Sequence, residues 1–212
     1  MSFYWIKTNA LIKTFFPNYV WDIPNKKNCV YLTFDDGPTQ EITEWVLKLL
    51  KEEKITATFF CIGKNILAAP DLLKQIIKDG HAVGNHTHNH YNGWKTTEAI
   101  YLENTKKCDA IITTNTGKQS QLFRPPYGKI KRGQAKKIKE IGYKIIMWDV
   151  LSADFDHQIT PEKCLHNVIS TVKSGSIIVF HDSLKASKNL KYTLPKAIDY
   201  LKQKGFTFET IR

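Results

Sequence analysis

The stretch Thr33-Phe34-Asp35-Asp36-Gly37-Pro38 places two adjacent carboxylates where a buried strand is predicted to end. Two like charges this close raise the pKa of one group unless a cation or a strong donor compensates for them. The pair therefore predicts a metal ion, an arginine, or both as neighbours. The alternative is an ordinary turn with solvated acids, because Asp-Gly and Gly-Pro are common turn signals.

The composition indicates one folded domain. Of the 212 residues, 42% are hydrophobic and 12% are aromatic, which is enough for one sizeable core. The 31 Lys and Arg exceed the 20 Asp and Glu, and the formal net charge of +11 would attract nucleic acid, acidic glycans or an anionic cell envelope. Because the basic residues are spread along the chain without a nucleic-acid-binding motif, we interpret them as a solvated surface and expect no nucleic-acid partner.

Cysteine usage and hydropathy indicate no disulfide framework and no membrane span. The cysteines at positions 29, 61, 108 and 164 form no C-x-x-C pair and are expected to be reduced and buried. Met1 to Pro24 has no uninterrupted apolar core of signal-peptide length. No segment approaches the ~20 apolar residues that span a bilayer. These features predict a cytoplasmic protein without a transmembrane segment, and we expect a monomer.

From about Asn28 the chain alternates short β-branched or aromatic runs with longer amphipathic stretches, which indicates repeated β-α units. Seven strands are expected at 30–34, 56–62, 81–84, 121–123, 143–150, 176–180 and 207–210, and helices at 41–53, 66–78, 97–113, 130–141, 161–173 and 194–204. Residues 1–27 lie outside this pattern. We interpret them as an N-terminal arm that packs on a domain of residues 28–212 through Trp5, Phe15, Phe16 and Trp21.

Polar residues follow five of the seven predicted strands at once. They are Asp35-Asp36, the segment from His86 to His90, Arg124, Asp149 with Asp154, and His181-Asp182. In a barrel the C-terminal strand ends converge on one rim, whereas a doubly wound open sheet spreads them along an edge. The pattern therefore favours an α/β fold of the incomplete-barrel type.

The segment His86-Thr87-His88-Asn89-His90 offers three imidazoles within five residues. Helical spacing would align His86 with His90 and turn His88 away, whereas an extended segment would put all three on one side. Two neutral imidazoles and the Asp36 carboxylate make the three-ligand, open-site set of a catalytic zinc or similar divalent ion. The alternative is a polar loop that binds no metal.

Three further residues could complete such a site. Asp35 could act as a base on water, since a metal lowers the pKa of its bound water to ~7. Arg124 could neutralise Asp35 or could instead be a surface ion-pair residue, and the two prolines after it could hold the backbone N–H of Tyr127 toward the site.

His181 ends the most apolar predicted strand, which makes it the candidate general acid for a leaving group. The alternative is a core histidine with no catalytic role. Asp149, Asp154 and Asp182 are candidates to hold its other ring nitrogen, and the spacing does not choose among them.

Three of these segments, in this order, resemble the motifs of the polysaccharide deacetylase family, whose module is the NodB homology domain. They are Thr-Phe-Asp-Asp-Gly-Pro at 33–38, His-Thr-x-x-His at 86–90 and Arg-Pro-Pro-Tyr at 124–127, and the resemblance runs from about Asn28 to the C-terminus. It implies a distorted, incomplete (β/α) barrel of about seven β-α units, a divalent metal that is most often Zn²⁺, and hydrolysis of acetyl groups on a poly- or oligosaccharide. Substrates of this family usually lie outside the cytoplasm.

The resemblance also implies a role for each site residue. Asp35 is the catalytic base, Asp36, His86 and His90 are the metal ligands, and His88 is not a ligand. Arg124 orients Asp35, the Tyr127 N–H completes an oxyanion site, His181 is the general acid and Asp154 tunes it. In the family an Asp-Trp pair is usual where this chain has Asp154-Phe155, and Trp148 or Trp94 could compensate for the smaller ring. The same fold could also serve an O-acetyl esterase on xylan-like glycans, or a glycan-binding protein without turnover.

Overall fold

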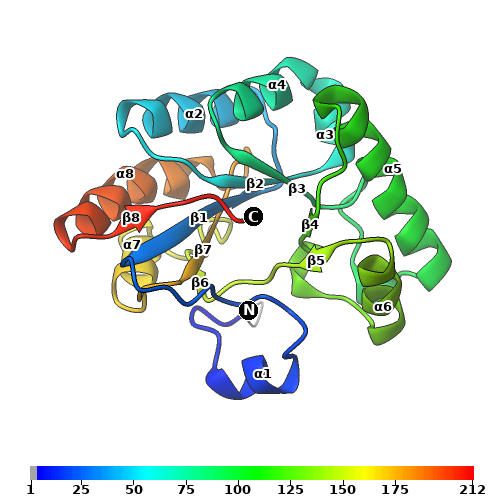
Figure 1. Cartoon of the computed structure of the whole chain (residues 1–212). Helices are drawn as coiled ribbons and strands as arrows, with labels where there is room; N and C mark the ends of the chain where they lie inside the picture. The colour runs from blue at the N-terminus through cyan, green and yellow to red at the C-terminus, as the bar shows by residue number, and fades with distance from the viewer. Residues whose placement is uncertain (1–3) are drawn as a thin grey trace.

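A curled parallel sheet forms the centre of the molecule (Figure 1). The computed structural model describes residues 4–212. The strands are β1 (Cys29–Asp35), β2 (Thr58–Cys61), β3 (Ala82–Asn85), β4 (Leu122–Phe123), β5 (Lys144–Ile145), β6 (Val150–Leu151), β7 (Ile177–His181) and β8 (Thr207–Phe208). Seven follow the order β5-β4-β3-β2-β1-β7-β6, and β8 pairs with the start of β1. The predicted distorted, incomplete (β/α) barrel is confirmed.

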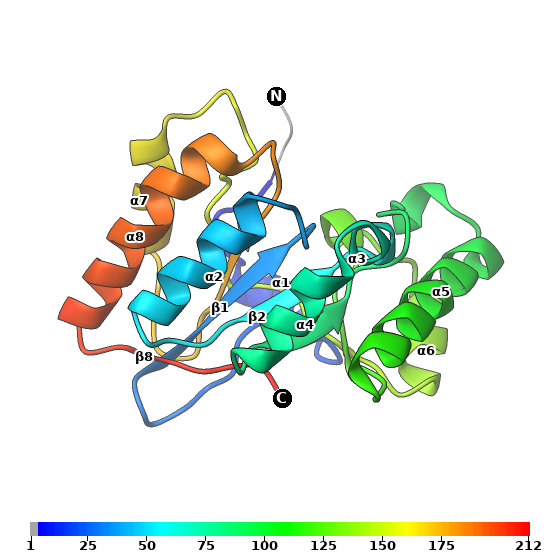
Figure 2. The ribbon, with the colours of Figure 1, turned by 90° about the horizontal axis from the view of Figure 1, so that it is seen from above.

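Helices follow the strands and cover the outside of this sheet (Figure 2). They are α1 (Ala10–Phe15), α2 (Ile42–Glu52), α3 (Gly63–Ala68), α4 (Pro70–Lys78), α5 (Glu98–Thr116), α6 (Arg132–Glu140), α7 (Pro161–Ile169) and α8 (Ser187–Gln203), with short 3₁₀ turns η1 (Gly93–Lys95) and η2 (Pro126–Gly128). No helix within residues 4–212 is long and apolar enough to cross a membrane.

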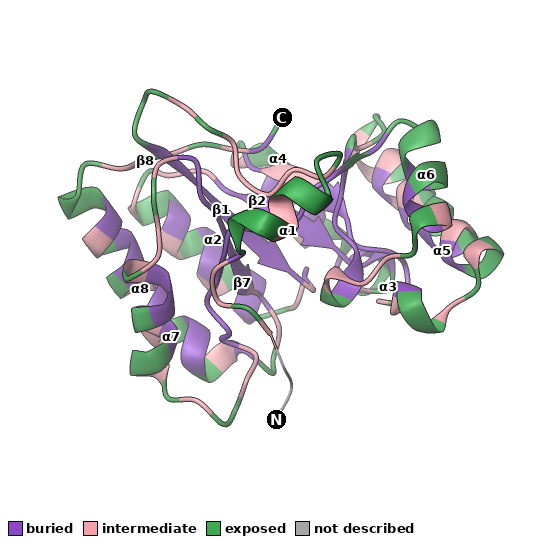
Figure 3. Cartoon of the chain, turned by 90° about the horizontal axis from the view of Figure 1, so that it is seen from below, coloured by how far each residue is buried: buried purple, intermediate pink, exposed green. Residues whose placement is uncertain are grey.

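The alternation of side chains along β1 determines where Asp35 points, the first of the two opening acids, Asp35 and Asp36. Val30, Leu32 and Phe34 point outward into the large apolar cluster beneath the helices, where Phe34 stacks 4.9 Å from Phe59. Because successive side chains of a strand face opposite sides, Asp35 points into the barrel. It pairs in register with His181 of β7. The C-terminal ends of the parallel strands therefore converge on one rim. The central strands β1, β2 and β7 are almost wholly buried (Figure 3).

Two predicted helices and one predicted strand differ from the structure. The helix expected at 66–78 is two helices, because Pro70 begins α4 and the residue before a proline avoids helical backbone. The helix expected from Leu194 begins at Ser187 and contains Pro195. The strand expected at 143–150 is divided into β5 and β6, which pair with β4 and β7 on opposite edges of the sheet.

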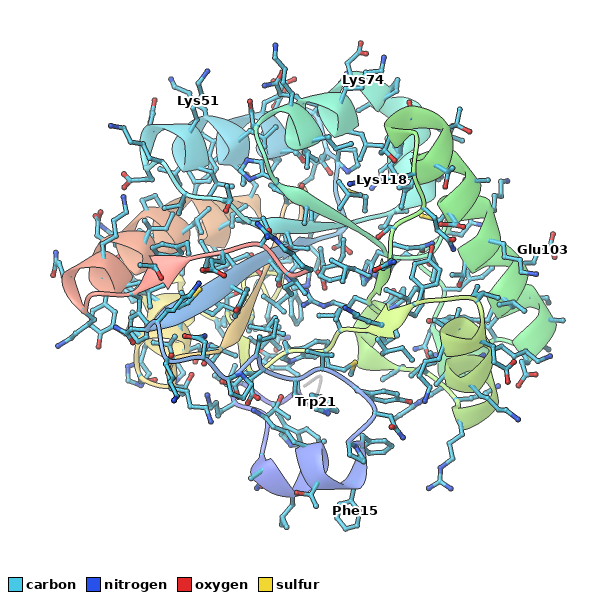
Figure 4. All side chains as sticks on the ribbon, in the orientation of Figure 1. Phe15, Trp21, Lys51, Lys74, Glu103 and Lys118 are labelled. Atoms are coloured by element: carbon cyan, nitrogen blue, oxygen red, sulfur yellow. The ribbon has the colours of Figure 1, made fainter. Side chains whose placement is uncertain are left out.

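The N-terminal segment fills the gap between β5 and β6. The Val20 N–H donates to the Ile145 carbonyl at 2.9 Å, and the Leu151 N–H donates to the Ile6 carbonyl at 2.8 Å. Tyr19 and Trp21 pack on one apolar cluster of the domain and Tyr4 and Ile6 on another. The expectation that Phe15 makes this contact is wrong: Phe15 is 77% exposed and points away at the end of α1, which buries no residue (Figure 4). Phe16 stacks on Tyr19 of the same segment, with ring centroids 5.7 Å apart.

Asp149 anchors this N-terminal segment rather than the rim. It precedes β6, and its N–H donates to Ile177 at the start of β7, so the expectation that it follows a strand is wrong. Its buried carboxylate forms ion pairs with Lys7 and Lys13 and accepts a hydrogen bond from Ser176 at 2.6 Å. A buried acid stays charged only when it is paired in this way.

Lys13→Met is expected to lower the free energy of unfolding by about 2 kcal/mol, because it leaves the Asp149 carboxylate with one ammonium partner. Urea unfolding followed by circular dichroism measures the change. Lys26→Met, which removes an exposed lysine of the same segment, is the control and should leave stability unaltered. Equal stability of Lys13→Met and the unsubstituted chain would contradict the anchoring role of this ion pair.

The candidate active site

Asp36, His86 and His90 bring three potential metal ligands together at the ends of β1 and β3. One ligand atom of each lies within 4.8 Å of the others. Asp36 Oδ1 is 3.2 Å from His90 Nε2 and 3.9 Å from His86 Nε2. Among residues 4–212 this oxygen is one of four buried side-chain atoms without a hydrogen bond, a costly state that a cation would relieve. The cluster therefore fits a divalent metal ion.

The charge states of the cluster suit a metal ligand set. Burial lowers the pKa of His86 to about 4, which keeps the imidazole neutral. His86 Nδ1 lies 2.7 Å from the Arg124 carbonyl and donates to it, so the lone pair of Nε2 faces Asp36. Although burial raises the pKa of Asp36, the imidazoles of His90, His181 and His86 hold it below its ordinary value.

The histidine loop is neither helical nor extended. Thr87 and His90 have left-handed backbone, with φ of 64° and 56°, and Asp36 on the facing loop has φ of 82°. Such conformations are strained for residues other than glycine and recur at functional sites. The turns send His88 away from the cluster and against Gly63, where a Cβ would lie 2.7 Å from its Nδ1. His88 is therefore outside the ligand set, as the resemblance implies.

Asp35 is paired with a fully buried arginine. Arg124 Nη1 donates to Asp35 Oδ1 at 2.6 Å and to Thr33 Oγ1 at 2.8 Å. Nη2 donates to the Met147 carbonyl at 2.9 Å, and the guanidinium lies 4.0 Å from the centroid of the Phe60 ring. The surface alternative for Arg124 is wrong. Asp35 Oδ2 accepts no hydrogen bond in the described chain and lies 4.0 Å from His86 Nε2, so it faces the metal cluster.

The partners that hold Arg124 were missed in the sequence. Thr33 lies in the opening stretch, and its place two residues before Asp35 puts both side chains on one face of β1. That spacing was a usable signal. No signal in the sequence pointed to Met147 or Phe60. Met147 contributes a backbone carbonyl, and Phe60 contributes a ring from a strand that is distant in sequence.

His181 is paired with Asp154 at the end of β7. Its Nδ1 lies 2.7 Å from Asp154 Oδ1, and its backbone N–H donates to Asp154 Oδ2 at 2.8 Å. Burial disfavours the imidazolium, but the Asp154 carboxylate outweighs it and raises the pKa of His181 to about 9. The ring is thus protonated near neutral pH, a state that suits a general acid.

The Asp182 carboxylate does not hold the His181 ring nitrogen but binds the turn that follows β1. Its Oδ1 accepts from the Gly37 N–H at 3.0 Å, and its Oδ2 accepts from the Thr43 hydroxyl at 2.6 Å. A Cβ at position 37 would lie 2.0 Å from the Asp182 carboxylate, so the approach requires glycine. Burial raises the pKa of Asp182 to about 7.

Tyr127 lies against His90 and Phe155 lies against His181. Tyr127 has left-handed backbone with φ of 60°, and no acceptor for its N–H is found among residues 4–212. Its hydroxyl lies 3.1 Å from His90 Nδ1. The Phe155 ring packs edge-on to His181 at 4.9 Å. Trp148 lies under the turn after Tyr127, where a Cβ at Gly128 would come within 2.7 Å of the indole.

A separate hollow of about 530 Å³ lies at the other end of the strands. Its lining includes Ile77, His81, Leu122 and Ile211, and none of the candidate catalytic residues. The rim that carries the Asp36–His86–His90 cluster is therefore the candidate active site.

Comparisons with known proteins show what the chain resembles as a whole. The family model described as polysaccharide deacetylase matches residues 22–146. A peptidoglycan-N-acetylglucosamine deacetylase of Bacillus cereus is 35% identical over 90% of both chains. The peptidoglycan-N-acetylmuramic acid deacetylase PdaA of Bacillus subtilis is 30% identical over 96% of this chain and 76% of its own. The crystal structure of the Bc1960 peptidoglycan N-acetylglucosamine deacetylase superposes with a TM-score of 0.87, at 34% identity over 92% of this chain and 91% of that one.

Proposed function

The chain belongs to the polysaccharide deacetylase family, and on this premise we propose that it releases acetate from N-acetylglucosamine units of a peptidoglycan- or chitin-type glycan with a bound zinc ion. As a family member it is a hydrolase of carbon–nitrogen amide bonds. One observation carries the proposal: the Asp35–Arg124 pair stands directly beside the Asp36–His86–His90 cluster. Two imidazoles and one carboxylate that leave a position open are the donor set of catalytic zinc.

In the proposed mechanism each acid of the opening pair has a separate task. Zinc held by Asp36, His86 and His90 would supply Lewis-acid chemistry, polarising a carbonyl and acidifying water. Asp35 accepts the proton of the attacking water on Oδ2, because Arg124 occupies Oδ1. Arg124 also holds the Asp35 carboxylate in a fixed orientation. The Tyr127 N–H donates to the acetyl oxygen as negative charge develops there.

His181 completes the reaction as the general acid. Asp154 holds its Nδ1, so that Nε2 carries the proton that passes to the departing amine. Acetate and a glucosamine unit are the products. The amide and ester versions of this reaction differ only in the leaving atom, so an O-acetyl esterase is the second candidate.

The experiment is acetate release, with metal analysis, on chitooligosaccharides, peptidoglycan fragments and acetylated xylan. We expect one zinc ion per chain and acetate from the first two substrates. Acetate from xylan alone would replace the proposal with the esterase. Glycan binding without acetate release would indicate a binding protein, and absence of both metal and acetate would reject the enzyme.

Asp154→Asn is expected to move the alkaline limb of the kcat–pH profile to lower pH. The pKa of His181 is about 9 because Asp154 stabilises the imidazolium, so activity should fall as pH rises through that value. Without this carboxylate, burial dominates and the proton is lost at lower pH. The control is Asp156→Asn, which removes the charge of a neighbouring acid that accepts a hydrogen bond from the Tyr4 hydroxyl. If the alkaline limb of the kcat–pH profile stayed at the same pH in Asp154→Asn, His181 would not be the general acid.

A further inference from the structure

Two lysine–aromatic pairs lie on opposite sides of the catalytic residues. Lys129 Nζ is 5.2 Å from the Trp94 ring centroid, and Lys185 Nζ is 5.7 Å from the Phe155 ring centroid. The first pair comes from the loops after β3 and β4, and the second from the loops after β6 and β7. Since β1 lies between these strand pairs in the sheet, the pairs flank the opening acids.

The Trp94–Lys129 pair is held by close backbone packing. The Gly93 N–H donates to the Lys129 carbonyl at 3.1 Å, and Gln134 Nε2 donates to the Gly93 carbonyl at 3.0 Å. A Cβ at position 93 would lie 2.4 Å from the Lys129 oxygen, so only glycine permits this approach. The loops thereby present the Trp94 indole, which is 61% exposed. Its partner Lys129 comes two residues after Tyr127 in the chain.

The Phe155–Lys185 pair adjoins the general acid. Phe155 packs edge-on to His181 at 4.9 Å and to Tyr4 at 5.4 Å, which fixes the ring. The neighbouring acid, Asp156, accepts a hydrogen bond from the Tyr4 hydroxyl at 2.6 Å. Lys185 itself is exposed.

These pairs differ from the other lysine–aromatic contacts in residues 4–212. Lys196–Tyr192 and Lys204–Tyr200 join neighbouring turns of α8 and its end, which is ordinary helix spacing. The flanking pairs join separate loops instead. Neither Lys129 nor Lys185 forms an ion pair with an acid among residues 4–212. The contact between an ammonium group and an exposed aromatic ring is weak. A sugar can therefore replace the lysine on the face of the ring, and the ammonium group can then bind an anion.

We propose that these two pairs are subsites for the sugars on either side of the reacting N-acetylglucosamine, and that they select sugars carrying a carboxylate. This inference rests on the proposed function. In an alternating glycan of peptidoglycan type, both neighbours of each N-acetylglucosamine carry a lactyl group, whereas chitin has no acid on either. Where the lactyl carboxylates are free of peptide, two ammonium groups, one on each side, match the alternating polymer.

The test compares two substrates of equal length: chitopentaose, and a peptidoglycan glycan fragment freed of peptides so that its lactyl carboxylates are ionised. Acetate release is measured for the unsubstituted enzyme and for Lys129→Met, Lys185→Met and the double variant. On the acidic glycan we expect kcat/KM to fall about threefold for each single variant and about tenfold for the double, through KM. Chitopentaose should be turned over at unaltered rates.

Lys51→Met and Lys74→Met are matched controls, because both lysines extend from α2 and α4 into solvent (Figure 4). Normal kinetics of the double variant on the acidic glycan, or equal losses on both substrates, would overturn the inference while leaving the deacetylase intact. Absence of acetate from both substrates with the unsubstituted enzyme would instead reject the proposed function.

Discussion

Replacement of Asp35 by Asn is expected to lower kcat by about 10³-fold while the bound metal is retained. The amide cannot accept the proton of the attacking water, whereas Asp36, His86 and His90 keep their ligand atoms. The buried Arg124 also loses its counter-ion, so we expect a lower Tm as well. Acetate release, metal content and thermal unfolding are measured on the same preparation.

The matched control for this substitution is Asp71→Asn. Asp71 lies in the first turn of α4, is exposed and is paired with Lys74, so its variant should keep full activity. If Asp35→Asn lost its metal together with its activity, the division of labour between the two opening acids would be wrong.

His86→Ala should weaken metal binding by more than about 100-fold and lose activity with it. The imidazole is one of three candidate ligands, and its neutral Nε2 faces Asp36. Added zinc should raise the Tm of the unsubstituted chain, because a ligand that binds only the folded state stabilises it. The same addition should leave the Tm of His86→Ala unaltered, which separates metal loss from misfolding.

His88→Ala provides the control within the same loop. Its ring stands against Gly63 and outside the cluster, so this variant should still gain stability when zinc is added. Loss of zinc binding in His88→Ala, with retention in His86→Ala, would reverse the ligand assignment.

The sequence was most informative where chemistry follows a strand directly. Asp35, His86, Arg124 and His181 each come at or just after a buried strand, and parallel strands bring such ends to one rim. The clustering of these residues could therefore be predicted before any coordinates.

The same reasoning failed where two candidates were alike in sequence. Asp149, Asp154 and Asp182 are all acids near predicted strand ends, yet they hold the N-terminal segment, His181 and the Gly37 turn respectively. Because residues 143–150 form two separate strands, Asp149 precedes β6 and lies at the end of the strands opposite the catalytic rim. Sequence spacing does not record which edge a strand joins.

By itself, the sequence determined the β-α pattern, the incomplete barrel and the identity of the metal and base candidates, because residue type and periodicity act locally. The tertiary structure alone decided how the opening acids are separated. Arg124 reaches Asp35 from β4, and the left-handed turns at Asp36 and His90 bring their side chains together. Those contacts depend on the curl of the sheet, which joins residues about 90 positions apart.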